Sequence, residues 1–161
     1  MLELSEKEDT IVVLRMTTRV CHFKTIVELN ERVSVEPKEY VKNAVKYIPV
    51  PANSLTLVKH SYNKLDNLKE YSENCPFNTE KIHSIKTGIV CSGCSYYFAK
   101  EVFGEDASYY KVGFVNPFPI EIIKAFAAKI DMVYVIEETD PLKNEMKLAE
   151  IDRTKIVGRS P

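Results

Sequence analysis

The chain has 161 residues, enough for one ordinary domain with extra segments but tight for two full domains. Its 22 basic and 23 acidic residues nearly balance at a net charge of -1, so no large positive surface is available to attract nucleic acid. The charged N-terminus is unlike a signal peptide, no apolar run approaches the roughly 20 residues of a membrane span, and the cysteines are few and unevenly spaced. We therefore expect a soluble cytoplasmic protein with reduced thiols, and neither nucleic acid nor membrane as a partner.

The first half of the chain predicts few regular elements. The charged turn from Glu3 to Asp9 resembles the end of a helix, and the β-branched run Ile11–Met16 predicts a strand buried on both faces of a parallel sheet. Residues 23–51 carry three prolines and are expected to form an extended connector. Apolar residues then recur every three or four positions from Leu55 to Leu68, which predicts an amphipathic helix capped by Asn53 or Ser54.

After Pro76 the pattern alternates regularly between strands and helices. This alternation predicts a three-layer α/β/α fold with an open, mostly parallel sheet of about four to five strands. If the strands at 88–91, 110–115, 132–136 and 155–157 are numbered 2 to 5, right-handed crossovers predict the sheet order 3-2-4-5. An upstream strand at Lys46–Val50 is a candidate for antiparallel addition to this sheet. The expected strands are 88–91, 110–115, 132–136 and 155–157, and the expected helices are 95–103, 119–129 and 141–149.

Cys91-Ser-Gly-Cys94 follows the strand at 88–91 and opens a helix, a placement in which a helix dipole lowers the pKa of a thiol. The pair could therefore form a redox disulfide. The elements that follow do not match thioredoxin-like order, so two buried, inert thiols are the favoured interpretation. No second paired motif accompanies the CxxC, and no metal site is predicted.

The loops that follow the parallel strands are expected to meet at the carboxyl edge of the sheet, where open α/β folds place ligands or partners. The two adjacent carboxylates among their residues are interpreted as solvated, helix-capping charges rather than a catalytic pair. The glycines fit neither a dinucleotide-binding motif nor a phosphate loop. The predicted edge residues are Ser92, Gly93, Asn116, Glu137 and Glu138.

A polar cluster directly follows the run Ile11–Met16. Its hydroxyl, guanidinium and imidazole groups could crown a sheet edge with donors suited to a carboxylate or phosphate, or could belong to an interdomain hinge. The cluster comprises Thr17, Thr18, Arg19 and His22.

Four stretches resemble, in order, parts of the large subunit of indolepyruvate:ferredoxin oxidoreductase. Leu14–His22 is similar to the end of its pyrimidine-binding domain. The resemblance implies that five residues of this stretch lie at the active-site side or at a domain junction, namely Arg15, Thr17, Thr18, Arg19 and His22. Gly88–Tyr96, Lys111–Pro119 and Val133–Pro141 are similar to its transketolase C-terminal-like domain. The resemblance implies a remnant of the pyrimidine-binding domain over 1–30, a connector with one helix over 31–79 and the α/β domain over 80–161.

The resemblance implies an intact enzyme that oxidatively decarboxylates arylpyruvates to aryl-acetyl-CoA and reduces ferredoxin, using thiamine diphosphate, Mg²⁺ and 4Fe-4S clusters. The motifs for these cofactors are absent here, so the segment is expected to bind no cofactor. No residue is assigned a catalytic step, and the segment is expected to act as a scaffold and interface. Its expected partners are the remaining domains of the same subunit and a smaller subunit, with ferredoxin and CoA serving the intact enzyme.

Three alternatives stay open from sequence. One is a segment of a pyruvate- or oxoglutarate-type ferredoxin oxidoreductase. Another is a free-standing α/β module that binds a nucleotide or a protein. The third is a CxxC thiol oxidoreductase built on Cys91 and Cys94.

Overall fold

The computed structural model describes residues 2–13, 16, 18–37, 39–138 and 141–158. The chain separates into two compact units, residues 1–64 and 65–161. Helix α4 (Pro51–Glu73) begins in the first unit and ends in the second. The predicted boundaries after residues 30 and 79 concern the domains of a family and stay a prediction.

The regular elements described in the first unit are helices, namely α1 (Leu2–Glu8), α2 (Thr18–His22), α3 (Ala44–Tyr47) and the start of α4. The strand predicted at Ile11–Met16 is wrong for its described residues, which lie in no strand, and Ile11 and Val13 are 90% and 76% exposed. A buried strand needs neighbours to pair with, and the described residues of this unit supply none.

The antiparallel strand predicted at Lys46–Val50 is also wrong. Lys46 and Tyr47 end α3, whose first turn is capped by the Asn43 side chain accepting from Lys46 N at 3.0 Å. The antiparallel strand of the sheet is instead β1 (Thr79–Lys81), a short polar segment without the apolar alternation that predicts strands.

Helix α4 confirms the predicted helix but begins at Pro51, ahead of the expected caps. Asn53 and Ser54 lie inside it, and their side chains donate back to the carbonyls of Ile48 and Val50 at 3.0 and 3.3 Å. The proline suits the first helical turn, where its missing N–H has no partner to lose.

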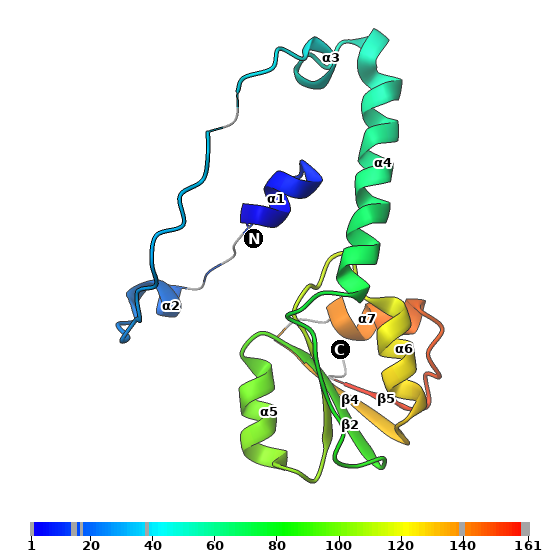
Figure 1. Ribbon diagram of the computed structural model, residues 1–161. Helices are drawn as coiled ribbons and strands as arrows, with labels where there is room; N and C mark the ends of the chain where they lie inside the picture. Colours follow the sequence, from blue (N-terminus) through cyan, green and yellow to red (C-terminus); the bar gives the residue numbers. More distant parts are fainter. Residues whose placement is uncertain (1, 14–15, 17, 38, 139–140, 159–161) are drawn as a thin grey trace. The chain divides into compact units, whose positions relative to one another are not determined.

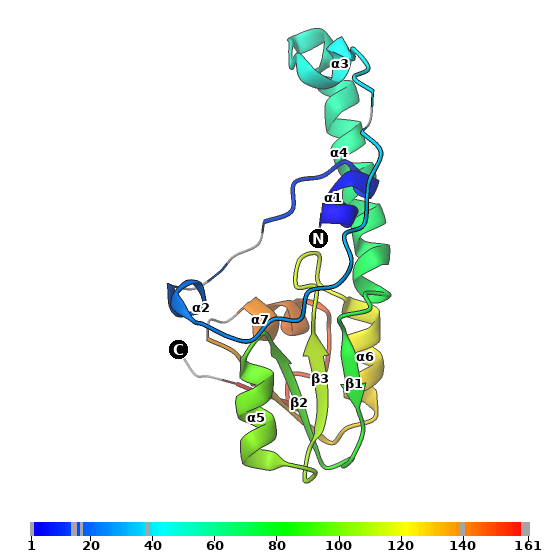
Figure 2. The ribbon, with the colours of Figure 1, turned by 60° about the vertical axis from the view of Figure 1, so that its left-hand side comes forward.

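The second unit confirms the predicted α/β fold and the order of its strands. Its five-stranded sheet has the order β1-β3-β2-β4-β5, in which β1 is antiparallel and the others are parallel (Figure 2). The elements are β2 (Thr87–Ser92), α5 (Ser95–Phe103), β3 (Ser108–Val112), α6 (Ile120–Ala128), β4 (Met132–Ile136), α7 (Pro141–Leu148) and β5 (Ile156–Val157).

Helices cover both faces of this sheet, with α5 on one side and α6 and α7 on the other (Figure 1). The larger core joins alternate residues of β2, β3 and β4 to α6 and α7, with Val90, Phe126 and Leu142 fully buried. The smaller core packs Ile89, Cys91 and Tyr109 against α5. Gly104 ends α5 with a φ of 55°, a left-handed conformation that glycine adopts without steric cost.

Within the described parts of the chain, no helix combines the length and the apolar character needed to cross a membrane.

Candidate functional site

The three parallel strands β2, β3 and β4 deliver the predicted edge loops to one end of the second unit. Ser92 closes β2 and is half-buried, and Gly93 follows it on the surface with a φ of 55°. Exposed Asn116 lies beyond β3, just before a cis Pro117. Glu137 and Glu138 follow β4, half-buried and exposed respectively. Because parallel strands share one carboxyl edge, these loops leave the sheet on the same side.

Glu137 caps helix α7. Its carboxylate oxygens accept hydrogen bonds from Leu142 N at 2.9 Å and Lys143 N at 3.0 Å, two of the backbone donors that a helix start leaves unpaired. A carboxylate also interacts favourably with the positive end of the helix dipole.

Helix α6 carries the same arrangement, supplied by a distant residue. Glu73, at the end of α4, accepts from Glu121 N and Ile122 N at 2.9 Å each. Its neighbour Ser72 is fully buried and donates to the carbonyl of Pro117 at 2.6 Å. Sequence reasoning missed Glu73, because nothing in the pattern of α4 links it to Glu121, which lies 48 residues later in the chain.

Helix α5 has no such cap. Cys94 occupies its N-cap position without a side-chain hydrogen bond, and Gly93 makes the turn from β2. Lys111, which is level with Cys91 across the β2–β3 ladder, places its ammonium 5.3 Å from the Tyr96 ring centroid and 5.1 Å from that of Tyr97. This corner of the edge thus combines a cation with aromatic rings.

The two cysteines of the CxxC motif lie in different environments. Cys91 is fully buried, and burial raises its pKa to about 12 against a smaller lowering by the nearby Lys111 charge. Cys94 is exposed, so the expectation of two buried thiols is wrong for Cys94, and both thiols are free. A redox pair needs a stabilised, accessible thiolate, whereas the environment of Cys91 opposes thiolate formation. The CxxC oxidoreductase stays an unfavoured hypothesis.

The polar cluster expected near residue 19 belongs to the first unit. Thr18 begins α2 and His22 ends it, and both are exposed. Arg19 lies within α2, whereas Arg15 and Thr17 lie outside the described residues. The predicted role of this cluster at an active site or domain junction therefore stays a proposal.

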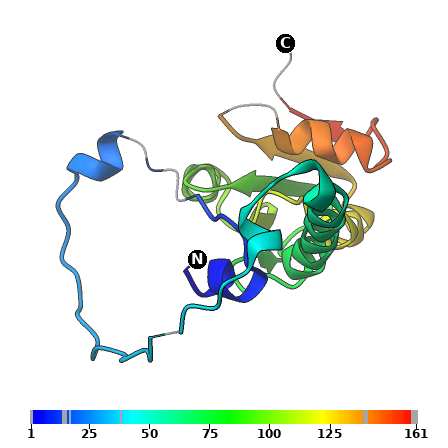
Figure 3. The ribbon, with the colours of Figure 1, turned by 90° about the horizontal axis from the view of Figure 1, so that it is seen from above.

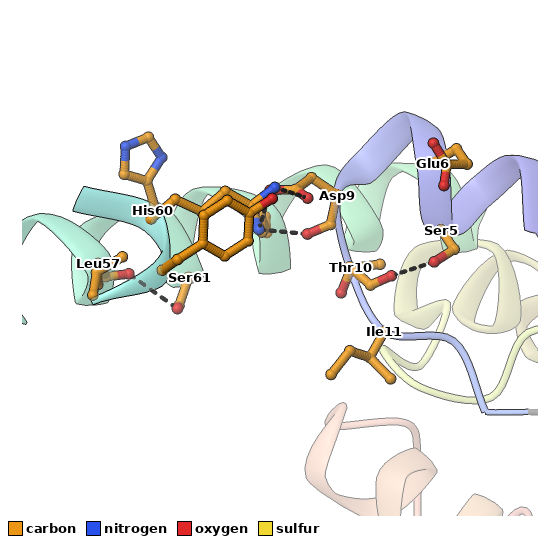
Figure 4. Close-up of a pocket in the computed structure, with 11 residues that line it drawn as sticks. Ser5, Glu6, Asp9, Thr10, Ile11, Leu57, His60 and Ser61 are labelled. Carbon is orange, nitrogen blue, oxygen red and sulfur yellow. Dashed lines mark hydrogen bonds and ion pairs between the residues drawn. The ribbon is translucent and has the colours of Figure 1, made fainter. Parts of the chain in front are cut away.

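The first unit also holds a polar pocket of about 810 Å³ that the sequence did not predict. Asp9 connects α3 and α4 across this pocket, because its carboxylate accepts hydrogen bonds from Lys46 Nζ at 2.5 Å and from Lys64 Nζ at 3.0 Å. Figure 4 shows Asp9 and Thr10 where the chain leaves α1, with Ser5 bonded to Thr10 and Ser61 to Leu57. The pocket is lined by Ser5, Glu6, Asp9, Thr10, Ile11, Lys46, Tyr47, Leu57, His60, Ser61 and Lys64.

Hydrogen bonds to the two lysines keep the Asp9 carboxylate ionised. Hydrogen bonds from Lys46 and then Lys64 lower the pKa of Asp9 to about 2, and the bond to Asp9 raises the pKa of Lys46. A carboxylate held ionised in this way is poorly suited to exchange protons near neutral pH. The arrangement favours a link between α1, α3 and α4 over acid–base chemistry.

Metal ligands do not converge in the described parts of the chain, where no group of three or more His, Cys, Asp or Glu side chains could hold an ion. Of the described cysteines, Cys75 and Cys91 are buried, whereas Cys21 and Cys94 are exposed. No step of chemistry is therefore assigned to a metal in this segment.

Comparison with known proteins gives a consistent set of relatives. No family model matches the chain. The indolepyruvate oxidoreductase subunit IorA of Methanothermobacter marburgensis is 32% identical over 153 residues, covering 91% of this chain and 25% of the relative. The IorA subunits of Thermococcus kodakarensis and Archaeoglobus fulgidus are 31% and 27% identical, covering 89% and 92% of this chain and 24% and 25% of the relatives. The chain thus spans about a quarter of the length of these curated relatives.

Among solved structures, the 2-oxoglutarate:ferredoxin oxidoreductase from Magnetococcus marinus with 2-oxoglutarate, coenzyme A and succinyl-CoA bound is 14% identical with a TM-score of 0.49. The match covers 70% of this chain and 21% of that one.

Proposed function

The chain is homologous to one segment of the IorA subunits of indolepyruvate oxidoreductases, and from that premise we propose that it serves as a scaffold and interface segment of a 2-oxoacid:ferredoxin oxidoreductase. The observation that carries the proposal is the sequence similarity, which extends over about nine-tenths of the chain. The assembled enzyme would oxidatively decarboxylate arylpyruvates to aryl-acetyl-CoA and reduce ferredoxin, with thiamine diphosphate, Mg²⁺ and iron–sulfur clusters bound outside this segment.

The carboxyl edge of the sheet supports a positioning role rather than chemistry. Glu73 and Glu137 each spend both carboxylate oxygens on helix starts, and the Cys91 thiol is buried. These groups hold α6, α7 and β2 in place, so their contribution is orientation and packing.

Exposed apolar side chains support the interface role. On α5, Tyr97, Phe98 and Val102 are 62%, 64% and 76% exposed. On α4, Leu55 and Tyr62 are 84% and 65% exposed. Large exposed apolar side chains are typical of surfaces on which other polypeptides pack. The proposed partners are the remaining domains of the large subunit and a smaller subunit, in the cytoplasm.

The cluster around α2 is proposed to lie at a domain junction of the assembled enzyme. Thr18 and His22 supply exposed donors there, and Arg15, Thr17 and Arg19 belong to the same stretch of sequence. No chemical step is assigned to any of them.

The test is an activity assay on the chain in its native assembly. The affinity-tagged chain, isolated from its own cells, should bring with it CoA-dependent reduction of ferredoxin by indolepyruvate, whereas the chain purified alone with thiamine diphosphate and Mg²⁺ should show none. Pyruvate and 2-oxoglutarate assayed in parallel separate the aryl-type enzyme from its pyruvate- and oxoglutarate-type alternatives. Isolation of the tagged chain without any oxoacid-dependent activity, or turnover by the chain alone, would contradict the proposal.

A further inference from the structure

Residues 23–36 form an unpartnered stretch of the first unit. They follow the end of α2 at His22, run as a drawn-out trace towards α3 (blue to cyan in Figure 3), and are all exposed. Within the described parts of the chain, their backbone groups make no hydrogen bond. Such a stretch offers a row of free N–H and C=O groups to another strand.

The sequence of this stretch has the period of a strand with one apolar face. Side chains alternate between the two faces of a strand. The odd positions are Phe23, Thr25, Val27, Leu29, Glu31, Val33 and Val35, while the even positions are Lys24, Ile26, Glu28, Asn30, Arg32, Ser34 and Glu36. One face is therefore mostly apolar and the other mostly charged or polar. No glycine or proline interrupts residues 23–36.

We propose that residues 23–36 pair antiparallel with the same residues of a second copy of this chain, about a two-fold axis at Asn30. Residues at equal distances before and after Asn30 then face each other, as an isologous contact requires. Asn30 is also the midpoint between Phe23 and Pro37. A proline cannot donate to the ladder, so this register uses the whole stretch available.

Charge complementarity selects this register. Lys24 faces Glu36 and Glu28 faces Arg32, and two-fold symmetry makes each pair twice. Opposite charges placed directly across a ladder stabilise the pairing, and like charges destabilise it. On the other face, Val27 meets Val33 and Thr25 meets Val35, while Leu29 opposite Glu31 is the unfavourable contact.

The neighbouring registers lose this match. An axis at Glu28 sets that residue against itself and Lys24 against Arg32. An axis at Arg32 sets that residue against itself and Glu28 against Glu36. An axis at Glu31 sets that residue against itself, and an axis at Leu29 forms no ion pair. Axes at Ile26 and Ser34 also oppose unlike charges, Lys24 with Glu28 and Arg32 with Glu36, but each of them pairs no more than half of the stretch. The axis at Asn30 pairs unlike charges along the whole stretch without opposing like ones.

Charge-reversal variants of the full chain test the pairing. Glu28→Arg and Arg32→Glu each convert both copies of one attractive pair into repulsive ones, and each should weaken self-association about tenfold or more in sedimentation measurements. The double variant restores opposite charges and should recover the wild-type association. An equimolar mixture of the two single variants should form mixed dimers, because every reversed position then meets its complement.

A disulfide trap tests the register in a background where exposed Cys21 and Cys94 are replaced by serine. Asn30→Cys sets two thiols directly opposite each other, within the Cα separation that a disulfide spans, and should yield a covalent dimer under mild oxidation. Ser34→Cys is the control on the same face, since its two thiols lie about 27 Å apart by the rise of a strand. Equal yields of covalent dimer at both positions would overturn the pairing. A wild-type chain that stays monomeric at all protein concentrations in the sedimentation measurements would also overturn it.

The pairing is independent of the proposed enzyme, since it rests on residues 23–36 alone. Loss of oxoacid-dependent activity from the native assembly would leave these measurements unchanged, and failure of the trap would leave the enzyme assignment unchanged. The two proposals therefore fail separately.

Discussion

Two adjacent tyrosines of β3 should respond in opposite ways to removal of their hydroxyl groups. Tyr109 and Tyr110 are each 1% exposed. Tyr109 donates to the carbonyl of Gly104 at 2.7 Å, whereas the Tyr110 hydroxyl has no hydrogen-bond partner among the residues that the structure describes. A net hydrogen bond contributes about 1 kcal/mol, while a buried unpaired polar group costs about 1 to 3 kcal/mol.

Tyr109→Phe should therefore lower the free energy of unfolding by about 1 kcal/mol, and Tyr110→Phe should leave it unchanged or raise it by up to about 1 kcal/mol. Urea unfolding followed by circular dichroism measures both, with each variant serving as the other's control because ring, strand and burial are matched. In a domain of the size of the second unit, residues 65–161, a change of about 1 kcal/mol shifts the melting temperature by roughly 4 to 8 °C. A loss for Tyr110→Phe as large as that for Tyr109→Phe would show that the hydroxyl has a partner.

The alkaline limb of stability gives a second measurement on Tyr110. Burial raises its pKa to about 12, above the unfolded value near 10. The folded state then holds the phenolic proton more tightly than the unfolded state. The resulting contribution of Tyr110 to the free energy of unfolding is complete below about pH 10 and is lost as the pH rises towards 12. Tyr110→Phe should flatten the decline over that range. An unchanged slope would contradict the raised pKa.

Glu73→Ala removes both hydrogen bonds that cap α6 and should lower the free energy of unfolding by about 1 to 2 kcal/mol. The control Glu70→Ala, at an exposed position of α4, should change it by less than about 0.5 kcal/mol. Equal losses for the two variants would contradict the capping role of Glu73. Alkylation of the native protein followed by mass measurement should modify Cys94 and spare Cys91, whose pKa burial raises to about 12. Rapid modification of Cys91, or a reversible disulfide between the two thiols, would revive the redox hypothesis. Asp9→Asn should raise amide exchange in α1 roughly two- to fivefold at low salt and less at high salt, since the ion pairs are partly exposed; exchange insensitive to the substitution would mean that packing alone holds α1.

The second unit could be predicted well because its signals are local. The helix at Ser95–Phe103 and the strand at Met132–Ile136 match the structure residue for residue. Strand β3 begins two residues earlier than expected and ends at Val112, where Gly113 N turns to the Asn78 side chain instead of the ladder. That contact joins residues 35 positions apart and leaves no trace in the pattern around Gly113.

The first unit could not be predicted in the same way, because apolar periodicity was taken to imply burial. Ile11–Met16 has the composition of a buried strand, yet Ile11 is 90% exposed. Periodicity states which side chains could share a face, and only a neighbouring element decides whether that face is covered. The contacts that do organise this unit, from Asp9 to Lys46 and Lys64, join charges 37 and 55 residues apart.

The carboxyl edge of the sheet is where open α/β proteins commonly receive anionic ligands, because helix starts there present unpaired N–H groups and a positive dipole. In this chain the starts of α6 and α7 are already occupied by Glu73 and Glu137, whose charges would repel an incoming phosphate or carboxylate. The predicted edge residue Glu137 is thus committed to holding a helix in place. Two of the three helix starts at this edge are therefore closed by the chain's own carboxylates, and only the start of α5 lacks a side-chain cap. Exposed apolar side chains lie on α5, on α4 and along residues 23–36. Exposed apolar side chains of this kind suit contact with other polypeptides.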